Sequence, residues 1–327
     1  MKRAYLTAFG DPADVVEIRD DPEPSEPTGE QVLVDVLAAA INPAELLLIQ
    51  GRYASRPALP VPLGIEGAGR VRAVGPEVLG LHEGDLVMCL GRQNWSERLL
   101  VEARDLVRLP PAIDPLQAAM LKVNPATALM MLRDITPLRA GDWVVQNAAN
   151  SGVGRNLIRL AASMPVKTVN IVRRESLIEE LEREGADAVV LDGPDLSARV
   201  RAAVDGPIRL GIDAIGGEAT AMIGDCLADE SVIANYGLLS GKPCQLGTEH
   251  LIFRSIVLRG FWLSKELSAM NRAAVDALYG DLADQVVAGI LHVPVQATYG
   301  LDDIGAALGH ALREGRDGKI LITPSER

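Results

Sequence analysis

Cysteine is scarce in this sequence, and the few cysteines lie far apart. Cys89, Cys226 and Cys244 are the three cysteines of the 327-residue chain. Three thiols at these spacings cannot build a disulfide framework or a four-cysteine zinc site, so we expect them to be buried and unreactive. Aromatic residues are also rare, at 3% of the chain, which makes the place of each tyrosine and tryptophan informative.

Long apolar runs and an excess of basic residues are missing as well. No stretch of 18 consecutive apolar residues is present, and the first residues do not resemble a leader peptide. The formal net charge is −12, which disfavours nucleic acids and anionic membranes because both are negatively charged themselves. The sequence therefore predicts a cytoplasmic protein with no nucleic acid and no membrane among its partners.

The centre of the chain carries the pattern of a strand, a tight turn and a helix. The apolar run Trp143–Gln146 leads into the small and polar residues 147–154, and residues 157–162 have helical apolar spacing. Small residues let the backbone approach a phosphate, and a helix N-terminus offers unpaired N–H groups and a positive dipole end. By itself this turn is weak evidence, because Ser151 stands where a Gly-Gly-Val-Gly turn has its first glycine.

A second apolar run, residues 168–172, follows at the distance expected for the next strand and ends at Arg173 and Arg174. In a dinucleotide-binding unit this strand end faces the adenosine ribose, where a carboxylate suits NAD and an arginine suits the 2′-phosphate of NADP. Without a cofactor, two arginines after a strand would simply be exposed to solvent at the strand end. The order of strand, turn, helix, strand and arginine pair favours NADPH as the cofactor.

The rest of the chain predicts an α/β protein of two domains. Short β-type runs separated by glycine and proline fill residues 1–110, and residues 143–236 alternate strand and helix patterns, which predicts a doubly wound parallel sheet. The tail from 293 to 322 has a strand, helix, strand pattern and is too short for a domain. We therefore expect it to complete the first domain around an inserted nucleotide-binding domain.

Five stretches resemble, in the same order, the medium-chain dehydrogenase/reductase superfamily, and within it the zinc-free 2-enoyl thioester reductases of the mitochondrial type. They are Ile41–Glu45, Ile49–Tyr53, Val123–Ala128, Gln146–Gly154 and Gly260–Ser264. The resemblance implies a GroES-like β-rich catalytic domain over 1–120, completed by 290–327, and a Rossmann domain for NADPH over 121–289. It also implies a homodimer paired through an edge strand near Arg254–Gly260.

The zinc ligands of related dehydrogenases are missing from the corresponding positions. Where zinc-dependent members have a cysteine and a Gly-His-Glu triplet, this chain has Asn42 and Gly64-Ile65-Glu66. Neither asparagine nor isoleucine supplies a thiolate or imidazole, and the four histidines lie elsewhere, so we expect no metal. Asn42, followed by Pro43 and Glu45, is equally well explained as the start of a helix.

Without a metal, hydride delivery to a carbon already activated by conjugation is the accessible chemistry. Hydride adds at Cβ of an α,β-unsaturated thioester, and the charge that develops on the oxygen needs a hydrogen bond or a proton donor. The resembled family uses a tyrosine in the segment that here ends in Tyr53, which makes Tyr53 the catalytic candidate. From the residues alone, packing of Tyr53 against Pro57 and Pro60 explains it as well.

The remaining site residues follow from the resemblance by position. The predicted cofactor-binding residues are Asn147, Gly152, Val153, Gly154, Asn170, Arg173, Arg174, Tyr236, Gly237, Leu238, Phe261, Trp262, Leu263 and Lys319. The predicted substrate-pocket residues are Asn42, Trp95, Asn124 and Leu129. The expected ligands are NADPH and a small-molecule acyl thioester.

Two alternatives remain open at the level of the sequence. A zinc-free NADPH:quinone oxidoreductase of the same superfamily would have the same architecture and would reduce a quinone. A non-catalytic NADPH-binding protein would keep the turn and lack a working acceptor site.

Overall fold

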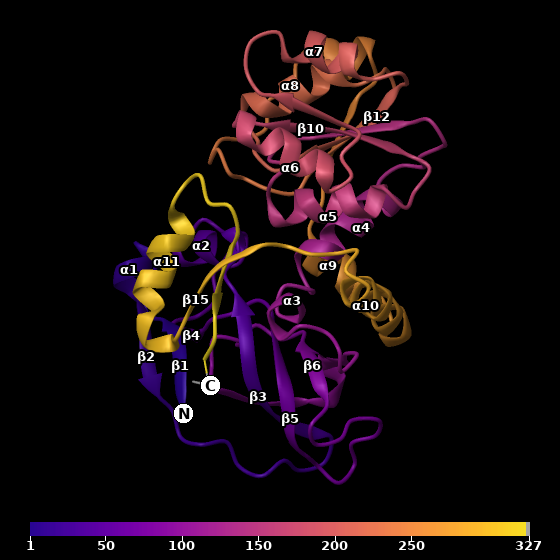
Figure 1. The fold of residues 1–327 in the computed structure, drawn as a ribbon. Coiled ribbons are helices and arrows are strands. Elements are labelled where there is room, and N and C mark those ends of the chain that lie inside the picture. Colours follow the sequence, from indigo (N-terminus) through magenta and orange to yellow (C-terminus); the bar gives the residue numbers. More distant parts are fainter. Residues whose placement is uncertain (325–327) are drawn as a thin grey trace. The chain divides into compact units, whose positions relative to one another are not determined.

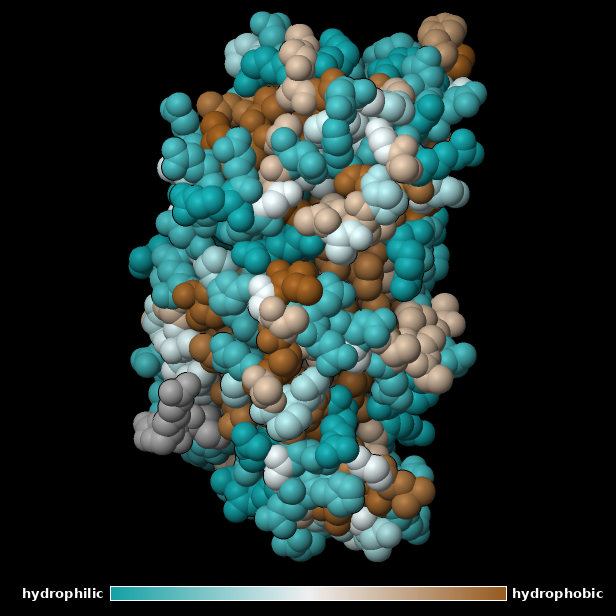
Figure 2. Space-filling model, turned by 45° about the vertical axis from the view of Figure 1, so that its right-hand side comes forward, coloured by the Kyte–Doolittle hydropathy of each residue, from teal (hydrophilic) through white to brown (hydrophobic). Residues whose placement is uncertain are grey.

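The computed structural model describes residues 1–324 and divides the chain into two compact units. Unit 1 combines Met1–Val123 with the chain from Asn271 onward, and unit 2 is Asn124–Met270. The insertion of one unit into the other agrees with the order of patterns in the sequence. Within the described residues, no helix has the length and apolar character needed to cross a membrane. The face drawn in Figure 2 is covered mainly by hydrophilic residues, with hydrophobic residues in smaller groups.

Unit 1 is built on two β-sheets. The larger has the strand order β15-β16-β3-β5-β6-β8 with β7 also paired to β3, and the smaller has the order β2-β1-β4. The strands are β1 (Lys2–Leu6), β2 (Val16–Asp20), β3 (Gln31–Ala40), β4 (Val61–Pro62), β5 (Gly67–Val74), β6 (Leu86–Cys89), β7 (Arg98–Glu102), β8 (Leu106–Arg108), β15 (Val295–Tyr299) and β16 (Lys319–Ile322). The helices are α1 (Pro12–Val15), α2 (Pro43–Ile49), α3 (Pro115–Ala118), α10 (Arg272–Val287) and α11 (Ile304–Leu312).

The tail of the chain completes unit 1. Strand β16 pairs antiparallel with β3, with Leu321 opposite Ala40, and Ile320 and Ile322 join the buried apolar cluster around Trp95. Helix α11 lies beside α1 from the other end of the chain (Figure 1). The tail therefore adds core side chains to this unit as well as strand pairing.

Helix α10 also belongs to unit 1, so the chain returns earlier than the position 290 expected from the sequence. Its Tyr279 is fully buried and donates a hydrogen bond to the Lys122 carbonyl oxygen at 3.0 Å, and Arg272 donates to the Leu106 carbonyl oxygen at 2.5 Å. Both contacts join residues that are more than 150 positions apart, which helical periodicity alone does not reveal.

Unit 2 holds a six-stranded sheet of order β11-β10-β9-β12-β13-β14, whose neighbouring strands are all parallel. The strands are β9 (Trp143–Gln146), β10 (Lys167–Val172), β11 (Ala188–Leu191), β12 (Ile208–Asp213), β13 (Val232–Asn235) and β14 (Val257–Gly260). The helices are α4 (Asn124–Asp134), α5 (Gly152–Ala161), α6 (Ile178–Arg183), α7 (Leu196–Ala203), α8 (Glu218–Cys226) and α9 (Leu263–Ser268). The predicted doubly wound parallel sheet is confirmed.

The two-residue period of the strands explains why helices cover both faces of this sheet. On β10, Val169 and Ile171 pack in one cluster with residues of α7 and α8, whereas Val172 packs in another with Ile158 of α5 and Leu181 of α6. Asn170 therefore shares the α5 face, which decides its hydrogen bonds below.

Candidate active site

The turn after β9 has the geometry of an anion-binding loop. Ala148 adopts a φ of 48°, in the region that side chains rarely occupy, and Ser151 caps α5 by accepting a hydrogen bond from the Gly154 N–H at 3.1 Å. A Cβ on Gly154 would lie 2.4 Å from the Ala149 carbonyl oxygen. This close approach explains the glycine and leaves the N–H groups of Gly152 and Val153 at the positive end of the helix dipole.

The predicted cofactor residue Asn147 is held by a carboxylate that the sequence did not single out. Asn147 donates from Nδ2 to Asp213 at 2.7 Å and accepts from the Ala214 N–H at 2.8 Å. The fully buried Asp213 also accepts from Thr220 and Asn235 and from the backbone N–H groups that follow it. Asp213 thus ties together the carboxyl ends of β9, β12 and β13, and its place at a strand end was the available signal.

Tyr236, Gly237 and Leu238 follow β13 and reach the same turn. Burial raises the pKa of the Tyr236 phenol to about 12, and the nearby Ser151 partly offsets this effect. A Cβ on Gly237 would lie 2.4 Å from the Ala214 carbonyl oxygen. The structure therefore brings Tyr236 and Gly237 together with the turn at 147–154, although they are more than 80 residues away in the sequence.

Three residues at the end of β10 were predicted to contact the adenosine ribose: Asn170, which is buried, and Arg173 and Arg174, which are nearer the surface. Asn170 is fully buried, donates to Thr168 and the Ala188 carbonyl oxygen, and accepts from Gln146 at 2.7 Å. Both N–H donors of its amide are used inside the unit, because its side chain points to the α5 face of the sheet. Arg173 is exposed and Arg174 half-buried, and both follow the last residue of β10.

Phe261, Trp262 and Leu263 follow the outermost strand β14. The Phe261 N–H donates to the Asn235 carbonyl oxygen at 2.8 Å, so the segment begins beside the end of β13. Phe261 is buried, Trp262 is 44% exposed and Leu263 starts α9. An exposed tryptophan in a chain poor in aromatics is consistent with a binding role, whereas Phe261 is a core residue.

Tyr53 lies in unit 1, on the turn that ends α2. The predicted helix start is confirmed: Pro43 opens α2, and Glu45 accepts a hydrogen bond from the Asn42 N–H at 2.9 Å. After the helix, the Tyr53 N–H donates to the Leu47 carbonyl oxygen, and the half-buried ring packs against the core of the unit with the Arg92 guanidinium carbon 5.8 Å from its centre. The structure therefore gives the Tyr53 ring a packing role and a cation–π contact, and its catalytic role stays a prediction.

Asn42 and Lys319 belong to a buried polar cluster of unit 1, which also contains Glu45, Glu66 and Lys122. Asn42 donates from Nδ2 to Glu66 at 2.7 Å and accepts from Lys319 Nζ at 2.5 Å, and Lys319 also donates to the Ile41 carbonyl oxygen. Burial lowers the pKa of Lys319 and raises that of Glu66, and each charge partly offsets the effect on the other. The ammonium group of Lys319 is bonded within unit 1 to Asn42 and Ile41, and its predicted contact with the cofactor stays a prediction.

Lys122 and Glu45 complete the cluster. Lys122 donates to the carbonyl oxygens of Ile65 and Leu90, both at 2.6 Å, and burial lowers its pKa to about 8. Burial raises the pKa of Glu45 to about 7, although the Ile65 N–H donates to its carboxylate. With an ammonium group 2.5 Å from the Asn42 oxygen, these residues do not fit a zinc ion. No group of three potential metal-ligating side chains occurs within residues 1–324.

The predicted pocket residues have different surroundings. Trp95 is fully buried in the core of unit 1 and donates from Nε1 to the Ala40 carbonyl oxygen at 3.2 Å, so the structure gives it a packing role in place of the predicted pocket-lining one. Leu129 is half-buried on α4. Asn124, the first residue of α4, lies against Gly152 of the turn.

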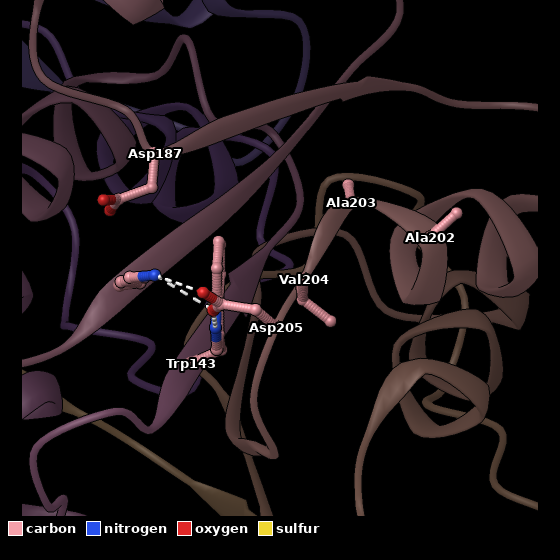
Figure 3. Close-up of a pocket in the computed structure, with 7 residues that line it drawn as sticks. Trp143, Asp187, Ala202, Ala203, Val204 and Asp205 are labelled. Atoms are coloured by element: carbon pink, nitrogen blue, oxygen red, sulfur yellow. Dashed lines mark hydrogen bonds and ion pairs between the residues drawn. The ribbon is translucent and has the colours of Figure 1, made fainter.

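A pocket of about 360 Å³ in unit 2 is lined by no residue of this turn. Figure 3 draws the residues that line it. It is lined by Trp143, Lys167 and Asp205 at the amino ends of β9 and β10, whereas ligands of such sheets bind at the carboxyl ends. Lys167 and Trp143 both donate to Asp205, at 2.8 and 3.0 Å. Its charged groups thus satisfy one another, and we assign it no role in catalysis.

Comparison with known proteins relates the chain to oxidoreductases. Residues 28–111 match the alcohol dehydrogenase GroES-like domain, and residues 152–279 match the zinc-binding dehydrogenase family. The human mitochondrial enoyl-[acyl-carrier-protein] reductase is 34% identical over 96% of this chain and 86% of its own length. That relative is named as mitochondrial, so the comparison does not support the expected cytoplasmic location.

Two solved structures share the fold. A putative NADPH:quinone reductase from Bacillus thuringiensis has a TM-score of 0.89 at 27% identity, with 99% of each chain covered. The complex of Etr1p, a 2-enoyl thioester reductase from Candida tropicalis, with NADP and crotonyl-CoA has a TM-score of 0.88 at 23% identity, covering 98% of this chain and 99% of that one. The chain therefore belongs to the medium-chain dehydrogenase/reductase superfamily and is an oxidoreductase related to the enoyl-[acyl-carrier-protein] reductases.

Proposed function

We propose that this protein reduces the conjugated carbon–carbon double bond of a 2-enoyl thioester with NADPH. The observation that carries the proposal is the 34% identity to the human enoyl-[acyl-carrier-protein] reductase along 96% of this chain. The lack of fit to zinc around Asn42 supports it, because a substrate activated by its own conjugation needs no metal to polarise it.

In this proposal, residues of the turn in unit 2 bind the cofactor, and Tyr53 of unit 1 acts on the substrate. NADPH, when bound, supplies the hydride that adds to Cβ. The N–H groups of Gly152 and Val153 would hold the pyrophosphate, and Tyr236 would close the nicotinamide side of the turn. Tyr53 would hydrogen-bond the thioester oxygen as negative charge develops there, or pass its hydroxyl proton to Cα, since a phenol is protonated at neutral pH.

The test is a substrate panel with wild type and Tyr53→Phe side by side. Crotonyl-CoA, a longer enoyl-CoA, a simple enone and a quinone are compared by NADPH consumption. We expect enoyl turnover that falls about 100-fold in Tyr53→Phe, the scale of a lost general acid, with NADPH affinity unchanged. Tyr299→Phe is the matched control, because its hydroxyl is bonded to His310 in the same unit. A folded, NADPH-binding protein that leaves every enoyl thioester unreduced contradicts the proposal.

Quinone reduction is the second candidate, because the quinone reductase from Bacillus thuringiensis shares the fold at 27% identity. Quinone turnover without enoyl turnover would select it. In that case Tyr53→Phe should have little effect, since quinone reduction depends less on a positioned proton.

The preference for NADPH over NADH is proposed from Arg173 and Arg174. The two arginines come directly after β10, where the 2′-phosphate of NADPH would lie. A guanidinium group can donate two parallel hydrogen bonds to a phosphate. Arg173→Ala should weaken NADPH binding and leave NADH binding unchanged. Equal losses for both cofactors would contradict this assignment.

A homodimer is proposed from the outer edge of unit 2. Strand β14 is the last strand of its sheet. Its first residue, Val257, is 54% exposed, and the preceding residues Leu251, Ile252 and Phe253 are 49%, 64% and 80% exposed. An exposed apolar edge strand favours pairing with a second copy. Light scattering should give a dimer that Val257→Lys weakens, and a wild-type monomer at micromolar concentration would contradict it.

A further inference from the structure

Two loops of unit 1 meet at Tyr53. The first is the turn after α2, which carries Tyr53 itself, and the second is the segment of residues 91–95 between β6 and β7. The guanidinium carbon of Arg92, in the second loop, lies over the Tyr53 ring at 5.8 Å from its centre, which is within the range of a cation–π contact. A positive charge therefore lies beside the phenol that the proposed reaction uses.

The charge of Arg92 is not neutralised by a neighbouring carboxylate. Arg19 makes a similar contact with the Tyr5 ring, at 5.2 Å from its centre, but its guanidinium group also pairs with Glu17. Within residues 1–324, Arg92 forms no such ion pair, and its guanidinium group contacts the Tyr53 ring. The chain has 44 acidic and 32 basic residues, so this is a cation that an acidic protein leaves uncompensated beside one particular tyrosine.

Buried groups fix the backbone next to Arg92. Asn94 is fully buried and donates from Nδ2 to the carbonyl oxygens of Gly91 and Gly64, at 3.0 and 2.9 Å. The Gly91 carbonyl oxygen also accepts from the buried Lys122 ammonium group at 3.4 Å. Because the loop is fastened in this way, the Arg92 side chain loses less conformational freedom when it contacts the ring.

We propose that Arg92 is a positioning residue that acts on the reaction through Tyr53, by stabilising negative charge on the phenol oxygen. The inference rests on the proposed function. Hydride addition at Cβ moves the π electrons of the double bond into the enolate, which then forms the Cα–H bond with the Tyr53 proton. The O–H electron pair stays on the phenol oxygen until water returns a proton to it. A cation beside the phenol favours this charged form.

The experiment compares Arg92→Gln and Arg92→Lys with wild type in steady-state turnover of two thioesters, crotonyl-CoA and crotonyl-N-acetylcysteamine. The second thioester carries no phosphate, so it separates an effect through Tyr53 from recognition of the phosphates of coenzyme A by Arg92. Arg19→Gln is the matched control, because it removes an arginine–tyrosine contact elsewhere in the same unit. Arg92→Gln is also combined with Tyr53→Phe, which keeps the ring and removes the hydroxyl.

We expect Arg92→Gln to lower kcat about 5-fold with both thioesters, the scale of an exposed cation–π contact, and to leave the KM for NADPH unchanged. Arg92→Lys should keep most of the activity, because an ammonium group can lie over the ring as well. In the Tyr53→Phe background, Arg92→Gln should have no further effect on kcat, since the two residues act as one unit. Arg19→Gln should leave kcat at the wild-type value.

A raised KM for crotonyl-CoA in Arg92→Gln, with normal turnover of the phosphate-free thioester, would overturn the proposal and make Arg92 a phosphate contact. An unchanged kcat, or an equal loss with and without the Tyr53 hydroxyl, would overturn it as well. These results leave the proposed function intact, since wild type would still reduce the enoyl thioester. Failure of the proposed function itself has a different signature, because wild type that binds NADPH would then reduce neither thioester, and the role of Arg92 would be overturned with it.

Discussion

Replacement of Lys319 by methionine tests whether the buried polar cluster of unit 1 is held together by its charges. Lys319 is 8% exposed, and its ammonium group donates to the Asn42 oxygen at 2.5 Å and the Ile41 carbonyl oxygen at 3.1 Å. Methionine fills a similar volume but donates nothing. The variant leaves Glu66, which is fully buried, with less compensation for its charge.

The expected cost follows from the burial of both partners. Lys319 is connected to Glu66 through the Asn42 side chain and not by a direct ion pair. Loss of one of two compensating buried charges costs about 3–5 kcal/mol, because the other charge stays in the interior without compensation. At roughly 2–4 °C per kcal/mol for a domain of about 150–250 residues, the melting temperature should fall by about 6–20 °C. The assay is thermal unfolding followed by circular dichroism at neutral pH.

Two further variants make this prediction refutable. Lys2→Met removes a surface lysine paired with Asp302 in the same unit and should change little, because exposed pairs are screened by water. Lys319→Met combined with Glu66→Met should cost less than the sum of the single changes by at least about 1 kcal/mol, since the stranded charge is then gone. A fall of less than about 2 °C for Lys319→Met, or strict additivity, would refute the electrostatic account of the cluster.

Two other predictions concern the turn and the pH dependence of stability. Gly154→Ala should destabilise the protein by about 1–3 kcal/mol and weaken NADPH binding, because the new Cβ would lie 2.4 Å from a backbone oxygen. Gly280→Ala in α10 is the control: its Cβ would meet no neighbouring atom within 4 Å, so we expect it to stabilise the protein by about 0.5–1 kcal/mol. Burial raises the pKa of Glu45 to about 7 from an ordinary value of 4.5, so the folded state holds this proton more tightly than the unfolded state. Stability should therefore fall as pH rises from about 4.5 to 7, and comparison of unfolding curves should show wild type losing up to about 3 kcal/mol relative to Glu45→Gln over that range. Equal pH profiles for wild type and Glu45→Gln would contradict this, as would equal stabilities for Gly154→Ala and wild type.

Local patterns in the sequence were sufficient to predict the strand, turn and helix around residues 147–154. Strand β9, the capped helix α5 and strand β10 involve neighbours in the chain, and their signals are short-range: apolar period, a capping serine and glycines where the backbone comes close. The start of α2 at Asn42 and Pro43 was predictable for the same reason. The parallel sheet of unit 2 was predictable from the alternation of strand and helix patterns.

The tertiary structure decided what each polar side chain faces. The strand period turns Asn170 to the α5 face, and pairing of β16 with β3 brings Lys319 to Asn42; their predicted contacts with the cofactor stay predictions. The role of Asp213 depends on the packing of three strands whose ends it joins by hydrogen bonds. Sequence alone determined which elements form, because propensity and capping act over a few residues. Hydrogen-bond partners from distant segments depend on the packing of the whole unit, and this is why the tertiary structure alone assigned the buried polar groups their places.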